Sequence, residues 1–370
     1  MSGVCSTDDR TVDPMVERKQ WNRPTTRPGD GVRRPTRLRM GALIALVALA
    51  AGGCREPATG PGETTAQTGP VAAADFDLQG HRGARGLKPE NTLPAFETAL
   101  DLGVTTLEMD LHFTADGVVV VWHDPVIDVA KCAIDPTASN LEHDPRTAED
   151  ASLNLAQLTY DQLGAYRCDK NPDPSRFPEQ SPAPTALAGR AYGIPTLVDV
   201  FEFVGRYAAA AEKTQDQRRN AASVRFNIET KRVPGDPATI GDGFDGESPG
   251  PFELAILAAI NEFGLSDRVT IQSFDHRSLR AVRSVNQTVG LAALTAGNQS
   301  FPADMVAWGA TVWSPDHRAV TAARIAAAHE EGLLVVPWTV NDPERMESLV
   351  ALGVDGLITD RPDLAEDLLP

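Results

Sequence analysis

Eight apolar, strand-like runs alternate with alanine-rich helical segments along most of this 370-residue chain. Strands that alternate with helices in this way form a parallel sheet, because each helix returns the chain to the start of the next strand. Eight such units predict an α/β fold, the (β/α)8 TIM barrel, whose site lies at the carboxyl ends of the strands. The predicted strands are Phe76–Gly80, Thr105–Phe113, Val224–Lys231, Arg268–Phe274, Val289–Thr295, Thr311–Pro315, Leu333–Val340 and Gly356–Thr359.

A ninth extended run, Val118–His123, follows the second strand after only four residues. A parallel crossover needs a dozen or more residues, so this run predicts an antiparallel hairpin that leaves the barrel. Depending on where the turn is centred, His123 would pair with Glu108 or with Asp110. Either register brings His123 back to the end of the second strand.

Residues 125–193 form an irregular segment rich in Asp, Asn and Pro, with one helical stretch near Leu155–Tyr166. The segment is too long for a plain loop in a compact domain, and we interpret it as an insertion that caps the site. It contains Cys132 and Cys168, which predict a disulfide if the protein is exported to an oxidising compartment. The alternative is two buried thiols.

The N-terminal 53 residues have the features of an export signal. The basic segment Arg33–Arg39 precedes the uncharged run Met40–Gly53, which is too short for a membrane span. The sequence Ala51–Cys54 resembles a bacterial lipobox, in which the cysteine is lipidated. We therefore expect a lipid anchor at Cys54 in the cell envelope of a bacterium, the alternative being an ordinary cleaved signal and a periplasmic or secreted protein. Residues 54–74 predict a flexible tether, and residues 75–370 the folded domain.

The formal net charge of −17 argues against nucleic acid or an anionic membrane surface as a general partner. Any membrane contact would then come through the anchor.

Three carboxylates fall near the carboxyl ends of two predicted strands. Glu108 and Asp110 are two residues apart, so both side chains point to one face, and Glu229 occurs with Lys231 at the same spacing on a later strand. Three carboxylates at one barrel mouth would repel one another unless a cation lay between them. Oxygen ligands predict Ca²⁺ or Mg²⁺.

Two histidines complete this group of residues. His81 ends the first strand, and the hairpin places His123 beside the predicted metal site. Arg82 and Lys231 can neutralise a phosphate, and the histidines can supply the base and the acid that cleavage of a phosphodiester requires. These residues predict metal-assisted hydrolysis of a small phosphodiester.

The motifs HRG…PENT, EMD, the DG turn with VVxHD, IExK, SF and WTVN resemble the glycerophosphodiester phosphodiesterase family, part of the phospholipase C-like phosphodiesterase superfamily, over roughly Asp75–Leu369. The resemblance implies hydrolysis of glycerophosphodiesters such as glycerophosphocholine to glycerol 3-phosphate and an alcohol, with one divalent cation as cofactor. By position it implies metal ligands Glu108, Asp110 and Glu229, acid/base histidines His81 and His123, and phosphate-binding Arg82 and Lys231. Trp338 is a candidate wall of the glycerol pocket.

Three alternatives remain open from the sequence. A metal-free phospholipase of the same superfamily would act by internal attack of a substrate hydroxyl, but it would not need three carboxylates. A lysophospholipase D would need an apolar pocket mouth. An inactive, surface-anchored binding barrel would tolerate the loss of a histidine, whereas both are present.

Overall fold

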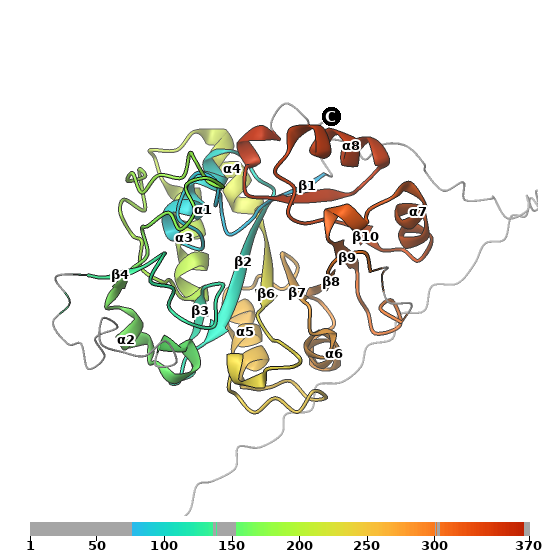
Figure 1. Ribbon diagram of the computed structural model, residues 1–370, viewed down its shortest axis with the longest axis horizontal. Coiled ribbons are helices and arrows are strands. Elements are labelled where there is room, and N and C mark those ends of the chain that lie inside the picture. Colours follow the sequence, from blue (N-terminus) through green and yellow to red (C-terminus); the bar gives the residue numbers. More distant parts are fainter. Residues whose placement is uncertain (1–75, 136–137, 139–152, 300, 302–303, 366–370) are drawn as a thin grey trace, which may run out of the picture. The chain divides into compact units, whose positions relative to one another are not determined.

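The computed structural model describes residues 76–135, 138, 153–299, 301 and 304–365. Eight parallel strands form the predicted barrel, and helices surround it (Figure 1). Their order around the sheet is β10-β9-β8-β7-β6-β2-β1-β11. The strands are β1 (Asp77–Gly80), β2 (Thr106–Phe113), β6 (Arg225–Thr230), β7 (Val269–Ser273), β8 (Gly290–Thr295), β9 (Val312–Pro315), β10 (Leu334–Val335) and β11 (Gly356–Thr359).

Backbone hydrogen bonds close the ring between the last two strands. Asp355 donates to the carbonyl of Val335 at 2.9 Å, and Ile358 donates to that of Pro337 at 3.0 Å. The predicted strand Leu333–Val340 is thus regular only over Leu334–Val335, because Pro337 has no N–H to donate. The remainder still bonds to β11.

The hairpin is antiparallel as predicted, but its register differs from both predicted alternatives. β3 (Val119–Val121) pairs with β2 so that Leu111 lies opposite Val121. The N–H of Trp122 donates to the carbonyl of Asp110 at 2.9 Å. The N–H of Thr114 donates to the carbonyl of Val118, so the turn is centred on a single residue rather than between two. As a result, Trp122 rather than His123 pairs with Asp110.

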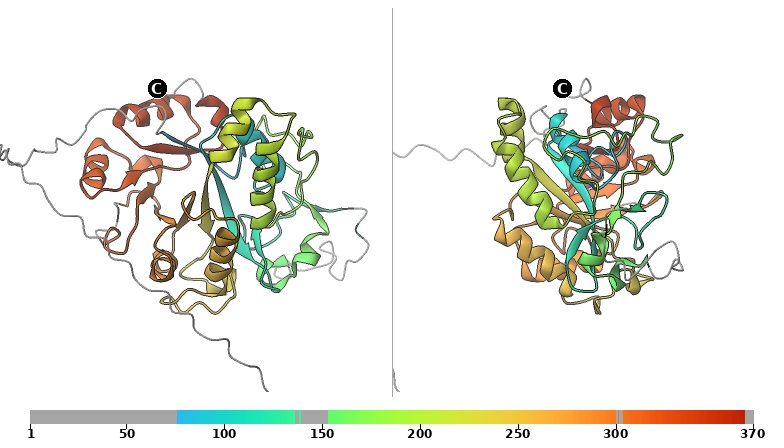
Figure 2. Two further views of the ribbon diagram at one scale, coloured as in Figure 1. Left: turned by 180° about the vertical axis from the view of Figure 1, so that it is seen from behind. Right: turned by 90° about the vertical axis from the view of Figure 1, so that its left-hand side faces the viewer.

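Most helices on the outside of the barrel begin at a capping residue. Thr92, Thr196 and Thr214 each accept a hydrogen bond from the first turn of the helix that follows. Helices α3, α4 and α5 pack on one side of the barrel (Figure 2). The helices of the barrel are α1 (Leu93–Asp101), α3 (Leu197–Ala209), α4 (Gln215–Ser223), α5 (Pro251–Glu262), α6 (His276–Val285), α7 (Ala322–Glu330) and α8 (Pro343–Leu352).

The described part of the insertion packs with the end of the hairpin around a second, smaller hydrophobic core. Trp122 lies in this core with Leu155 and Leu163. Cys132 and Cys168 form a disulfide. The expected helix over Leu155–Tyr166 is shorter than predicted. Its regular elements are β4 (Ala133–Ile134), the 3-10 turn η2 (Leu155–Gln157), α2 (Tyr160–Leu163) and β5 (Tyr166–Arg167).

The predicted export signal, the tether and Cys54 lie outside the described residues. Among the residues that are described, no helix is long and apolar enough to cross a membrane.

Candidate active site

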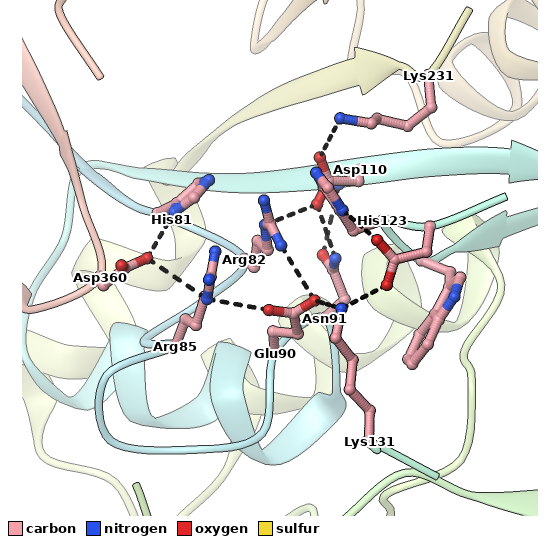
Figure 3. Close-up of polar contacts among 12 residues, drawn as sticks. His81, Arg82, Arg85, Glu90, Asn91, Asp110, His123, Lys131, Lys231 and Asp360 are labelled. Carbon is pink, nitrogen blue, oxygen red and sulfur yellow. Dashed lines mark hydrogen bonds and ion pairs between the residues drawn. The ribbon is translucent and has the colours of Figure 1, made fainter. Parts of the chain in front are cut away.

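A cavity of about 390 Å³ opens at the carboxyl ends of the barrel strands. It brings together all the predicted site residues of the barrel except Asp110, which is fully buried and contacts two of the lining residues, Arg82 and Lys231 (Figure 3). The cavity is lined by His81, Arg82, Arg85, Glu108, His123, Asp124, Lys131, Arg176, Glu229, Lys231, Gln272, Phe274, Leu294, Trp338, Thr339 and Ile358.

His81 follows β1 directly and is held by an aspartate that follows the last strand, β11. Its Nδ1 lies 2.6 Å from Oδ1 of Asp360, and its Nε2 lies 3.9 Å from Glu108. Burial lowers the pKa of His81 to about 4, although Asp360 opposes the shift. Asp360 has a pKa below its ordinary value despite its burial, because His81 and Arg85 favour its ionised form. An ionised carboxylate only accepts hydrogen bonds, so Nδ1 of His81 carries the proton and Nε2 is free to accept one.

Arg82 lies in a backbone conformation that side chains rarely adopt, with φ at 51°. The conformation is stabilised because the Arg82 N–H donates to Oε2 of Glu108 at 2.8 Å and its carbonyl accepts from Asn91 at 3.0 Å. Gly83 follows, where a Cβ would lie 2.6 Å from the backbone of Ala95. The HRG motif is therefore a tight turn that places a guanidinium between the carboxylates.

Glu108, Asp110 and Glu229 converge as predicted, with one oxygen of each within 4.8 Å of the others. All three side chains are buried. Burial and the charge on Asp110 raise the pKa of Glu108 well above its ordinary value, and burial raises the pKa of Glu229 against the pull of Lys231. Burial would do the same to Asp110, but Arg82 and Lys231 hold its pKa well below the ordinary value.

The cluster fits a divalent cation. Oδ1 of Asp110 is buried and has no hydrogen-bond partner among the described residues, with the ammonium of Lys231 3.5 Å away. Raised pKa values at Glu108 and Glu229 mean that their ionised forms lack compensating positive charge, which a cation would supply. Oxygen-only ligands suit Ca²⁺ or Mg²⁺.

A polar network inside the barrel fixes the orientation of Glu108. Gln272 donates from Nε2 to Oε1 of Glu108 at 2.8 Å. Asn227 donates to Oε1 of Gln272 at 3.0 Å and to Oε1 of Gln79 at 2.7 Å. Each of these residues is buried, so the network stabilises one rotamer of the carboxylate.

His123 lies on the other side of the cavity and is also held by an aspartate. Its Nδ1 lies 2.7 Å from Oδ1 of Asp124, and Lys131 of the insertion pairs with Oδ2 of the same carboxylate. His112 lies 3.1 Å from the carbonyl of His123 through Nε2, and burial lowers its pKa to about 4. His112 therefore positions the end of the hairpin rather than reaching the cavity.

Glu90 forms ion pairs with three cationic side chains of the site. Its carboxylate lies 3.0 Å from Arg82, 3.0 Å from Arg85 and 2.8 Å from Lys131. These three positive charges outweigh its burial and lower its pKa to about 2. Glu90 thus joins the loop after β1 to the insertion (Figure 3).

Two aromatic rings form one wall of the cavity. Trp338 packs edge-on against Phe274 with ring centroids 5.4 Å apart, and its Nε1 donates to the carbonyl of Ser314 at 3.0 Å. That hydrogen bond fixes the indole, whose remaining surface faces the cavity. This wall is apolar.

The sequence-based prediction missed several residues of the site. Asp360 directly follows the carboxyl end of the last strand, as His81 follows that of the first. The rule that catalytic residues lie at the carboxyl ends of barrel strands could therefore have identified it. Gln272 lies similarly near the carboxyl end of its strand, β7. Lys131 and Arg176 come from the insertion, and no sequence pattern shows which residues of an irregular segment turn toward a cavity.

Comparison with known proteins agrees with this geometry. The family model described as "Glycerophosphoryl diester phosphodiesterase family" matches residues 81–364. A glycerophosphodiester phosphodiesterase from Bacillus altitudinis is 30% identical over 77% of this chain and 94% of its own length.

Solved structures show the same fold. One from Silicibacter pomeroyi, provisionally named a glycerophosphoryl diester phosphodiesterase, has a TM-score of 0.63 and 28% identity, and covers 80% of this chain and 92% of its own. An Oleispira antarctica phosphodiesterase solved with the product sn-glycerol-3-phosphate has a TM-score of 0.56 at 16% identity, over 80% and 98% of the two chains. With its barrel, its paired histidines and the matched family model, the chain belongs to the glycerophosphoryl diester phosphodiesterase family.

Proposed function

We propose that this protein hydrolyses glycerophosphodiesters to glycerol 3-phosphate and an alcohol, with His81 and His123 as the acid/base pair and one divalent cation as cofactor. The observation that carries the proposal is that two histidines, each held at Nδ1 by an aspartate, line the same cavity as carboxylates of the candidate metal cluster. Family membership supports the reaction class. The product named for the Oleispira antarctica relative fits the same chemistry.

Glu108, Asp110 and Glu229 would hold the cation, Ca²⁺ or Mg²⁺. A bound cation would neutralise charge on the phosphate oxygens as the reaction proceeds. Arg82 and Lys231 would contribute further positive charge at the phosphate. Trp338 would contact the carbon face of the glycerol arm.

The histidines would share two proton transfers. One takes a proton from the attacking oxygen as its bond to phosphorus forms, and the other gives a proton to the alcohol oxygen as the phosphorus–oxygen bond breaks. Asp360 and Asp124 each hold Nδ1, which leaves the Nε2 atoms for this exchange.

A lysophospholipase D activity has weaker support. The rim of the cavity carries Arg85, Lys131 and Arg176 on one side, and an acyl chain would have to displace water from these charges. A metal-free phospholipase has weaker support still, because the buried carboxylates of Glu108 and Glu229, whose pKa values are raised, would then lack the positive charge that a cation supplies.

The test is release of glycerol 3-phosphate from glycerophosphocholine and glycerophosphoglycerol by the purified domain, first with EDTA and then with Ca²⁺ or Mg²⁺ restored. We expect EDTA to abolish release and one cation to restore it. Release that is indifferent to EDTA would overturn the metal assignment, and no release with any cation would overturn the substrate class.

We also propose that Cys54 carries a lipid anchor and that residues 1–53 direct export from a bacterial cell. The basic segment, the short apolar run and the lipobox-like sequence support this. Metabolic labelling with an alkyne-tagged fatty acid should mark the wild-type chain and not a Cys54→Ala variant; equal labelling of both would contradict the anchor.

A further inference from the structure

Two arginines stack on one phenylalanine ring at the charged side of the cavity. The Cζ of Arg85, from the loop after β1, lies 4.5 Å from the ring centroid of Phe177, and the Cζ of Arg176 lies 5.0 Å from it. Phe177 is 4% exposed, so its ring is a fixed platform. Both arginines line the cavity that contains the histidines.

The outer guanidinium is free to bind. Within the part of the chain that the structure describes, Arg176 has no carboxylate partner at ion-pair distance, and its side chain donates no hydrogen bond. Its backbone N–H donates to Oδ1 and to the carbonyl of Asp173. Arg176 is also exposed to solvent at the cavity mouth.

The inner guanidinium is only partly engaged. Arg85 lies 3.0 Å from Glu90 and 4.0 Å from Asp360, in both cases through Nε. Its two terminal nitrogens make no hydrogen bond with the described residues, and in Figure 3 its contacts run to Glu90 and Asp360 from the Nε end. Burial and the neighbouring charge of Arg82 lower its pKa, and Arg176 adds to the shift. Arg85 and Arg176 therefore carry guanidinium N–H groups that have no hydrogen-bond acceptor among the described residues.

The two walls of the cavity have opposite chemistry. Phe274, Leu294, Trp338 and Ile358 make one wall apolar, which suits the neutral glycerol arm of a substrate. The arginine wall would repel a cationic head group such as choline, and its carboxylate neighbours are already engaged: Asp124 by His123 and Lys131, Glu90 by three cations. Guanidinium groups bind phosphate and carboxylate through paired, charge-assisted hydrogen bonds.

We propose that Arg85 and Arg176, held on Phe177, form a subsite for a phosphate or carboxylate on the alcohol arm of the substrate. This rests on the proposed function and deepens it. The preferred glycerophosphodiesters are then those with an anionic head group. Arg176 is the specificity-determining residue, because it comes from the insertion and makes no other side-chain ion pair or hydrogen bond in the described structure.

The test compares two esters that differ only at the head group: glycerophosphoglycerol, and the same ester with a phosphate on its terminal hydroxyl. Glycerol 3-phosphate release would be followed for both with the full domain and its restored cation. The wild type should show a kcat/KM at least about tenfold higher for the phosphorylated ester. The Arg176→Gln variant should lose this preference through a higher KM for that ester.

The matched control is Arg190→Gln, which changes an exposed arginine of the same insertion that does not line the cavity. It should keep the wild-type preference. Equal kcat/KM for the two esters in the wild type, or equal losses for both in Arg176→Gln, would overturn the subsite while leaving the proposed function intact. Failure to hydrolyse either ester would overturn both.

Discussion

Replacing Asp360 by asparagine should reverse the tautomer of His81. Asn341 fixes the orientation of the residue at position 360, because its Nδ2 donates to Oδ2 of Asp360 at 2.8 Å and its Oδ1 accepts from the Asp360 N–H at 2.9 Å. In the variant the amide oxygen would remain opposite the Asn341 Nδ2. The amide nitrogen would then face Nδ1 of His81 and donate to it, which moves the imidazole proton to Nε2.

The size of the effect follows from the interactions lost. A hydrogen bond to a charged group contributes about 1.5–3 kcal/mol, which corresponds to a factor of about 10 to 150. A carboxylate-to-amide change that reverses the tautomer of a catalytic histidine lowers turnover by as much as about 10⁴-fold. We therefore expect kcat for glycerol 3-phosphate release to fall by about 100-fold or more, with a smaller change in KM.

The control for this variant lies at the opposite end of the same strand. Asp355 forms an aspartate–histidine pair with His329 at 2.8 Å, remote from the cavity. Asp355→Asn should keep the wild-type kcat. A folded Asp360→Asn protein, verified by its circular dichroism and melting temperature, that retained more than half of the wild-type kcat would refute the role assigned to Asp360.

Three further predictions concern stability and metal binding. Since the pKa of Glu90 is lowered to about 2, its ionised form contributes about 3 kcal/mol to the free energy of unfolding above its ordinary pKa, and this is lost as pH falls toward 2. In Glu90→Gln, the free energy of unfolding measured by urea titration should therefore fall less steeply between the ordinary pKa and pH 2. An unchanged pH dependence would contradict this. Replacing Cys132 and Cys168 by serine should lower the free energy of unfolding by up to about 4 kcal/mol, since the disulfide closes a separation of 36 residues; an unchanged melting temperature would argue against it. Glu229→Gln should weaken Ca²⁺ or Mg²⁺ binding in calorimetric titrations by about tenfold or more, whereas Glu262→Gln on the outer helix α5 should not; equal affinities would remove Glu229 from the ligands.

The sequence predicted the barrel because its strands and helices follow the period of βα units closely. The carboxylates and histidines could be placed for the same reason: position at a strand end is a local property, and the barrel brings strand ends together. The hairpin register was wrong because a shift of one residue in a short turn is decided by packing, here of Trp122 in the core of the insertion.

The charged side of the cavity could not be predicted in this way. Lys131, Arg176 and Phe177 belong to an insertion without periodicity, and their placement depends on long-range contacts with Glu90 and Arg85. Asp360 was within reach of the strand-end rule, but its role depends on a hydrogen bond across 279 residues of sequence. Such pairings follow from the closure of the barrel and not from any local pattern.

The most direct test of the central claim is to remove each histidine and change the leaving group. His81→Ala and His123→Ala would be assayed on glycerophosphoglycerol and on the p-nitrophenyl ester of glycerol 3-phosphate, whose leaving group needs little protonation. Both variants should lose at least about 100-fold on the first ester, since general acid or base catalysis contributes about 10²–10⁴. The variant that lacks the acid should recover on the second ester, and the other should not. Wild-type rates in either variant on glycerophosphoglycerol would contradict the account.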